Sequence, residues 1–325
     1  SMPSCTTGFR ENRLILGAAI EGNMAGVYYQ ICAQNAPRTS SAPSRPSTAR
    51  PSTARPSTAP PSTRSTPTPR PQSASAPQRA QVAGPDARLQ GMVVSRQRVN
   101  QECELFVISP PLDFDSSAFC RPGMFCKLWG FNETKPVYLA MANGPEKFRK
   151  EGTLQFLVKY SEATRWMWSL NPGEEVEMSQ AQGKGFDTSK LESQVDTIIL
   201  LATGTGIAPI KAMLEEHVYR WRSLGKAVRL YYGYRGCAIP YKHLFDEWQR
   251  KGVEVLPVVS QPHLCAEWAG AVGYVQNHVK KDVEEGRILV RRTGMVMCGK
   301  NGMIEDATRE LTALGLPVHH IITNY

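Results

Sequence analysis

The sequence of 325 residues contains no run of about 18 consecutive apolar residues, the length that a membrane-spanning helix needs. No CxxC pair occurs among its eight cysteines, and their spacings match neither a zinc site nor an iron–sulfur cluster. The first residues also lack the apolar core of a secretory signal. We therefore expect no membrane span, no bound metal and, because scattered cysteines are usually reduced thiols, a cytoplasmic protein.

Acidic residues are absent from residues 37–85, although this segment holds seven arginines. Because the formal net charge of the whole chain is +9, the remainder is nearly neutral. The unit Arg-Pro-Ser-Thr-Ala occurs three times in tandem at residues 45–59. Such a composition cannot bury enough apolar surface to offset its ordering entropy, so we predict a disordered basic arm. Aromatic residues are missing from it too, which argues against stacking on nucleic-acid bases.

Two interpretations of this arm remain open. In the first, it is a solvated linker. In the second, it binds an acidic surface such as anionic lipid or the outer face of a microtubule, which would place the protein on the cytoskeleton or in a cilium axoneme. A plastid transit segment fits the composition but not the internal position. Residues 1–36, which precede the arm, receive no role.

Residues 87–190 contain short β-rich stretches separated by turn residues. The six stretches are 89–94, 103–108, 124–128, 137–141, 153–158 and 174–178. Strands of this length and spacing predict a small antiparallel β-barrel, which one short helix at 162–170 interrupts.

Residues 191–325 alternate between strand and helix patterns. The first strand, 196–202, contains the continuous apolar run 198–202, as expected for a strand buried on both faces. Further strands are predicted at 228–232, 254–259, 294–298 and 319–323, and helices at 207–223, 241–251, 272–284 and 302–314. This alternation predicts a doubly wound parallel sheet, so the fold class is a β-barrel followed by an α/β domain.

The first motif with chemical meaning is Thr-Gly-Thr-Gly-Ile-Ala-Pro at 203–209, between the apolar strand and a helix. Gly204 and Gly206 allow the backbone to come close to a ligand, and the helix start offers N–H groups to a pyrophosphate. Pro209 suits the first helical turn, where no N–H is needed. A plain strand–helix corner would also use glycine.

The second motif begins at Cys298 and Gly299, where another predicted strand ends before a helix. Ligands of open α/β sheets bind at this carboxyl edge. The thiol of Cys298 is either a small buried hydrophobic group or a neighbour of a hydride-transfer site.

The order of barrel, GTGIAP and CGxxxM resembles that of the ferredoxin–NADP reductase superfamily of two-domain flavoproteins. The run RPGMF at 121–125 resembles the PGQF strand of the family's barrel, and the run RLYYGYR at 229–235 is similar to plant fruit-protein-like FAD/NAD(P)-binding oxidoreductases. The resemblance covers about residues 87–325. It implies that the barrel holds FAD and the sheet domain holds NAD(P)H. Hydride would pass from nicotinamide to flavin, and electrons would then pass to an acceptor that the sequence does not name.

The resemblance also implies roles for individual residues. The residues that would contact the pyrophosphate and nicotinamide of the coenzyme are Gly204, Thr205, Gly206, Pro209, Cys298, Gly299 and Met303. Thr164 would contact the FAD diphosphate, and the terminal Tyr325 would stack on the flavin unless it is an ordinary strand end. Cys298 and Tyr325 are the candidate catalytic residues.

The chain departs from the family at the flavin motif Arg-x-Tyr-Ser. The aligned positions from 137 read Val-Tyr-Leu-Ala-Met, so Tyr138, Leu139, Ala140 and Met141 form the candidate flavin-contacting strand. Loss of a charge-assisted diphosphate contact costs about 1.5–3 kcal/mol, roughly ten- to a hundredfold in affinity. We therefore expect FAD binding that is weaker than in the parent family, with Lys135 or Tyr138 as compensating residues.

Coenzyme choice rests on three positions. Ser260 matches a serine that contacts the 2′-phosphate of NADP in the family, but its usual arginine neighbour is Gln261 here. Arg235 is a plausible replacement cation, so the sequence favours NADP(H) over NAD(H). The alternative to an oxidoreductase is an inactive scaffold of the same fold, tethered through the basic arm to an acidic polymer.

Overall fold

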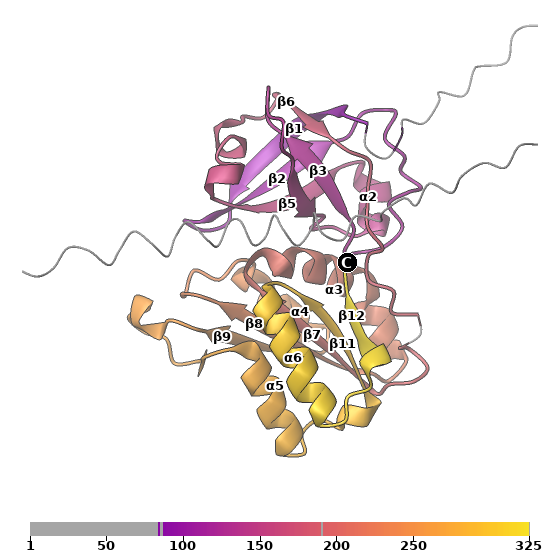
Figure 1. Ribbon diagram of the computed structural model, residues 1–325, viewed down its shortest axis with the longest axis vertical. Coiled ribbons are helices and arrows are strands. Elements are labelled where there is room, and N and C mark those ends of the chain that lie inside the picture. The colour runs from indigo at the N-terminus through magenta and orange to yellow at the C-terminus, as the bar shows by residue number, and fades with distance from the viewer. Residues whose placement is uncertain (1–83, 85–86, 190, 325) are drawn as a thin grey trace, which may run out of the picture. The chain divides into compact units, whose positions relative to one another are not determined.

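A computed structural model describes residues 84, 87–189 and 191–324, which build two six-stranded sheets (Figure 1). The predicted basic arm lies outside the described residues apart from Gly84, and so does Tyr325. The binding partners proposed for the arm and the role of Tyr325 therefore stay predictions.

The first sheet contains the predicted barrel strands. They are β1 (Leu89–Arg98), β2 (Cys103–Ser109), β3 (Phe125–Trp129), β4 (Val137–Ala140), β5 (Leu154–Lys159) and β6 (Glu175–Met178). All pairs are antiparallel in the order β4-β3-β6-β1-β2-β5, and a bridge between Met141 and Phe156 joins the two ends of the sheet. Phe106 and Phe156 are fully buried in the core that the strands enclose. The predicted antiparallel barrel is confirmed.

Helical segments of the barrel differ from the prediction. The helix α2 (Pro145–Glu151) was not predicted, because Gly144-Pro145 has the composition of a turn. Pro145 instead occupies the helix start, and Gly152 ends the helix at a left-handed φ of 68°. The predicted helix at 162–170 is two separate 3₁₀ turns, η1 (Glu162–Thr164) and η2 (Met167–Ser169).

The second sheet is parallel throughout. Its strands are β7 (Thr197–Thr203), β8 (Ala227–Tyr234), β9 (Val253–Val259), β10 (Ala271–Val272), β11 (Thr293–Cys298) and β12 (Ile321–Thr323). They follow the order β10-β9-β8-β7-β11-β12, which confirms the doubly wound sheet. The short strand β10 takes the place of the predicted start of the helix at 272. The last predicted strand is also shorter than expected, because residues 318–320 form the 3₁₀ turn η7 (Val318–His320).

Helices cover both faces of the parallel sheet. They are α3 (Ile207–Ser223), α4 (Phe245–Arg250), α5 (Val275–Glu284) and α6 (Asn301–Ala313). Ile198 and Leu200 of β7 pack with α3 and α4, whereas Ile199 and Leu201 pack with α5 and α6, which lie together on one face in Figure 1. Burial of alternate residues on opposite faces explains why the interior of this strand, from Ile198 to Ala202, is apolar. Short 3₁₀ turns complete the domain: η3 (Gly204–Gly206), η4 (Lys242–Leu244), η5 (Pro262–Leu264) and η6 (Val290–Arg292).

The barrel and the parallel sheet share buried contacts. Cys103 and Leu157 of the barrel belong to the same core cluster as α3. Lys211 of α3 is almost fully buried, and its ammonium group donates to the carbonyl of Ala142 at 3.1 Å. The same ammonium pairs with Glu215 at 2.7 Å, which compensates the charge that burial would otherwise leave alone. A polar contact thus fixes the start of α3 against the end of β4.

A disulfide joins Cys237, just after β8, to Cys265, after β9. The expectation that the cysteines are all reduced thiols is therefore wrong for this pair. Sequence spacing could not find the bond, because the two cysteines approach only when parallel strands place their following loops side by side. Within the described ranges no helix is long and apolar enough to cross a membrane, and no cluster of three His, Cys, Asp or Glu side chains is arranged to hold a metal ion.

Candidate functional site

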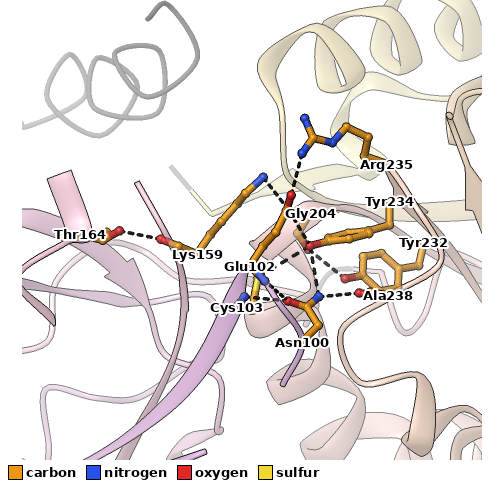
Figure 2. Close-up of polar contacts among 10 residues, drawn as sticks. All are labelled: Asn100, Glu102, Cys103, Lys159, Thr164, Gly204, Tyr232, Tyr234, Arg235 and Ala238. Atoms are coloured by element: carbon orange, nitrogen blue, oxygen red, sulfur yellow. Dashed lines mark hydrogen bonds and ion pairs between the residues drawn. The ribbon is translucent and has the colours of Figure 1, made fainter. Parts of the chain in front are cut away.

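The end of β7 forms the predicted cradle. The chain passes through η3 directly into α3, and Gly204 adopts a left-handed φ of 57°. No heavy atom beyond the chain neighbours lies within 4 Å of a Cβ built on Gly204, so the backbone there faces open space. The Gly204 carbonyl accepts a hydrogen bond from the Tyr232 hydroxyl at 3.1 Å (Figure 2). Burial raises the pKa of Tyr232 well above its usual value, which keeps this donor protonated.

The second motif lies against the first. Cys298 at the end of β11 is in register with Ala202 of β7. A Cβ built on Gly206 would lie only 2.3 Å from the carbonyl oxygen of Cys298. The Thr203 hydroxyl accepts a hydrogen bond from the backbone N–H of Lys300 at 2.9 Å. The structure therefore brings together two predicted loops that lie far apart in the sequence.

These two loops flank the point where the strand order reverses. From β7 the chain continues to β8 on one side, and it later returns as β11 on the other side. Such a switch point leaves a crevice at the carboxyl ends of the strands, which is where α/β sheets bind ligands. The described residues thus give the cradle both an open backbone and the expected topological position.

Three predicted residues of this region are buried rather than open. Pro209 lies within the buried side of α3, and Met303 packs in the core beneath α6. Cys298 is only 5% exposed. Contact of these three residues with a nicotinamide stays a prediction.

Arg235 and Ser260 follow the two neighbouring strands. The Ser260 N–H donates to the carbonyl of Tyr234 at 3.0 Å, and the Gln261 N–H donates to the carbonyl of Arg235 at 2.9 Å. These bonds continue the pairing of β8 with β9 beyond the sheet. The two predicted coenzyme residues therefore lie at the same carboxyl edge as Gly204.

A polar group from the barrel reaches this edge. Glu102, in the hairpin between β1 and β2, pairs with Arg235 at 2.6 Å and with Lys159 at 3.1 Å. The Tyr234 hydroxyl donates to the same carboxylate at 3.3 Å (Figure 2). We call Glu102, Lys159, Tyr234 and Arg235 the Glu102 cluster. Burial disfavours ionisation of Glu102, but hydrogen bonds and charges from Lys159 and Arg235 outweigh it and lower the pKa of this carboxyl.

Sequence patterns did not indicate that Glu102 belongs to the site. Asn100 and Glu102 lie in a polar hairpin turn, which by itself indicates only exposure to solvent. Their importance depends on which barrel hairpin meets the sheet, and this is a property of domain packing. Arg235 could therefore be predicted from the sequence, whereas the carboxylate that binds it could not.

The candidate flavin strand β4 is partly accessible. Tyr138, Leu139 and Ala140 are half-buried, whereas Met141 is fully buried and serves the barrel core. The ammonium group of Lys127, on the neighbouring strand β3, lies 5.8 Å from the centre of the Tyr138 ring. Lys127 therefore brings a cation beside the strand where the family pattern would have an arginine.

The segment after β5 contains Thr164, which was predicted to contact the FAD diphosphate. Thr164 is 9% exposed, and its hydroxyl donates to the carbonyl of Lys159 at 2.6 Å (Figure 2). Its N–H donates to the Ser161 hydroxyl. In the same segment the indole N–H of Trp168 is buried without a hydrogen-bond partner among the described residues. The cation beside β4 and the unpartnered indole N–H in the segment after β5 fit an anionic cofactor with hydrogen-bond acceptors at the barrel.

Comparisons with known proteins agree with this arrangement. The family described as oxidoreductase NAD-binding domain matches residues 200–309. The fruit protein pKIWI502 of Actinidia deliciosa is 32% identical over 193 residues, which are 58% of this chain and 59% of that protein. A ferredoxin–NADP reductase of Thermosynechococcus vestitus is 26% identical over 197 residues, 56% of this chain and 48% of the relative. The chain thus spans about half the length of these curated relatives.

Solved structures share the two-domain fold. The cytochrome b5 reductase domain of Ulva prolifera nitrate reductase aligns over its whole length with 75% of this chain. The TM-score is 0.59 and the sequence identity is 19%. A ferredoxin–NADP⁺ reductase from Neisseria gonorrhoeae, determined with bound FAD and NADP, gives a TM-score of 0.59 at 16% identity over 73% of this chain and 97% of that one. The barrel, the doubly wound sheet and these matches together give the chain the two-domain fold of ferredoxin–NADP reductases and support the resemblance to that superfamily.

Proposed function

We propose that this protein is a flavin-dependent NAD(P)H oxidoreductase that passes electrons from a nicotinamide coenzyme through FAD to an acceptor. The observation that carries the proposal is the open, left-handed Gly204 in the turn that leads into α3, with Gly206 of the same turn against the backbone of Cys298. A backbone of this form can approach a pyrophosphate closely, and a long helix that begins there favours negative charge.

The residues of the sheet domain would bind and orient the coenzyme. Gly204, Thr205 and Gly206 offer backbone to its pyrophosphate, and Tyr232 holds the Gly204 carbonyl away from it. The bond from Lys300 to Thr203 keeps the Cys298 loop at a fixed separation from the cradle. A nicotinamide held between two such fixed loops would have its reacting face aligned without further ordering.

The barrel would hold the flavin. FAD supplies the hydride-accepting chemistry, and the protein contributes position and electrostatics. Tyr138, Leu139 and Ala140 offer a half-buried surface for an aromatic ring system, and Lys127 offers a positive charge. η3 also lies against β5, so the coenzyme cradle meets the barrel wall.

Replacement of Lys127 tests the flavin part of this proposal. We expect the Lys127→Met variant to bind FAD roughly tenfold more weakly than the unchanged chain, because a charge-assisted contact contributes about 1.5–3 kcal/mol. The measurement is a titration with FAD, followed by the visible absorption of the bound flavin.

Lys150→Met is the matched control, since Lys150 is an exposed lysine on α2 of the same barrel to which no flavin contact is assigned. Its affinity for FAD should stay within about twofold of the unchanged chain, as for a surface charge that makes no direct contact. Equal losses in both variants would contradict the role given to Lys127. No flavin binding to the unchanged chain would contradict the proposed function.

A further inference from the structure

The end of the strand next to the phosphate cradle is where doubly wound sheets commonly distinguish the two nicotinamide coenzymes. In a doubly wound sheet with its phosphate cradle at one strand, the adenosine ribose lies near the end of the adjacent strand. An acidic residue there binds the ribose 2′-hydroxyl of NAD, whereas a nearby arginine accommodates the 2′-phosphate of NADP. β8 is adjacent to β7, and the residue directly after β8 is Arg235.

Arg235 is already engaged by an acid. Its guanidinium lies 2.6 Å from the Glu102 carboxylate, which the Tyr234 hydroxyl and Lys159 also bind. A 2′-phosphate would have to displace this carboxylate to reach the arginine and would meet its negative charge. A 2′-hydroxyl could instead donate a hydrogen bond to the same carboxylate without breaking the ion pairs.

The hairpin that carries Glu102 is held in place from both sides. The Asn100 side-chain oxygen accepts the N–H groups of Glu102 and Cys103 at 2.8 and 2.7 Å. The Asn100 amide donates to the carbonyl of Ala238 and to the Tyr234 hydroxyl in the sheet domain (Figure 2). Glu102 therefore belongs to a fixed contact between the barrel and the loop after β8, which orders it before any ligand binds.

We propose that Glu102, supplied by the barrel, is the residue that makes this site favour a nicotinamide coenzyme without a 2′-phosphate. The inference rests on the proposed function, because it concerns the adenosine end of the same coenzyme site. It reverses the sequence-based preference for NADP(H), which counted Arg235 as an available cation. The acidic residue that would bind the ribose 2′-hydroxyl is therefore supplied by the barrel and not by the parallel sheet.

The test compares two probes that differ only by the phosphate in question. Calorimetric titration of the full chain with 5′-AMP and with adenosine 2′,5′-bisphosphate gives the ratio of the two dissociation constants. We expect the unchanged chain to bind 5′-AMP at least as tightly as the bisphosphate. Glu102→Gln keeps the shape of the side chain, removes its charge and leaves Arg235 and Lys159 without their carboxylate. The variant should shift the ratio roughly tenfold toward the bisphosphate.

Two further variants make the result specific. Glu175→Gln removes an equal charge from an exposed position on β6 and should leave the ratio unchanged. Adding Arg235→Gln to Glu102→Gln should abolish the gain in bisphosphate affinity. Because 5′-AMP binding is measured in each variant, a folding defect would be visible as a loss of both ligands.

The results distinguish a failure of the role given to Glu102 from a failure of the proposed coenzyme site. A clear preference of the unchanged chain for the bisphosphate, or an unchanged ratio in Glu102→Gln, would overturn the role of Glu102 while the nucleotide site stands. Failure of the unchanged chain to bind either probe would overturn the proposed coenzyme site, and the inference with it.

Discussion

Replacing Gly206 by alanine is expected to weaken binding of NADH or NADPH roughly ten- to a hundredfold. The added Cβ would lie 2.3 Å from the carbonyl oxygen and 2.6 Å from the carbonyl carbon of Cys298. Both are backbone atoms, so no side-chain rotation relieves the contact, and the two loops must move apart. Insertion of a methyl group into such a close contact costs about 1–3 kcal/mol, which sets the size of the loss. Fluorescence titration with reduced coenzyme measures it.

Gly286→Ala provides the control for backbone effects. Gly286 has a left-handed φ of 75° and no heavy atom within 4 Å of a built Cβ, and it follows the far end of α5. Alanine there should lower the free energy of unfolding by about 1 kcal/mol, through strain alone, and leave coenzyme affinity unchanged. Unaltered coenzyme binding in Gly206→Ala would show that contact between the two loops does not shape the site.

Loss of the disulfide between Cys237 and Cys265 is expected to lower the free energy of unfolding by about 3 kcal/mol. The bond closes a loop between cysteines 28 residues apart, and a cross-link of this span removes chain entropy mainly from the unfolded state. Denaturant unfolding with and without a dithiol reductant measures the difference. The double variant Cys237→Ser and Cys265→Ser should be less stable by a similar amount and should not respond to the reductant.

Peptide mapping decides whether the disulfide is present in the protein. Under native, non-reducing conditions the peptides that contain Cys237 and Cys265 should resist alkylation and run as one cross-linked species. Full alkylation of both thiols in the folded protein, with no effect of reductant on stability, would contradict the bond.

Much of the fold could be predicted from local sequence patterns. The run 198–202 is apolar on both faces of the strand, as expected for a strand that is buried on both sides. The helix α2 escaped prediction because Pro145 signals a turn as strongly as a helix start. β10 escaped because two residues carry no periodicity.

The sequence predicted only those parts of the site that directly follow strands of the parallel sheet. The Gly204 and Cys298 loops each follow a buried strand, so the sheet topology alone places them at one edge. Glu102 and Lys127 come from the barrel, and their relevance depends on cross-strand pairing and on the contact with the parallel sheet. No sequence periodicity records that contact, because hairpin turns are polar wherever they lie.

The central claim is that this chain moves reducing equivalents from a nicotinamide coenzyme to a bound flavin. The most direct test is the visible spectrum of the full chain loaded with FAD, followed after anaerobic addition of NADH and, separately, of NADPH. We predict that NADH bleaches the flavin band and that NADPH does so more slowly at equal concentration. A bound flavin whose band neither coenzyme changes would contradict the account.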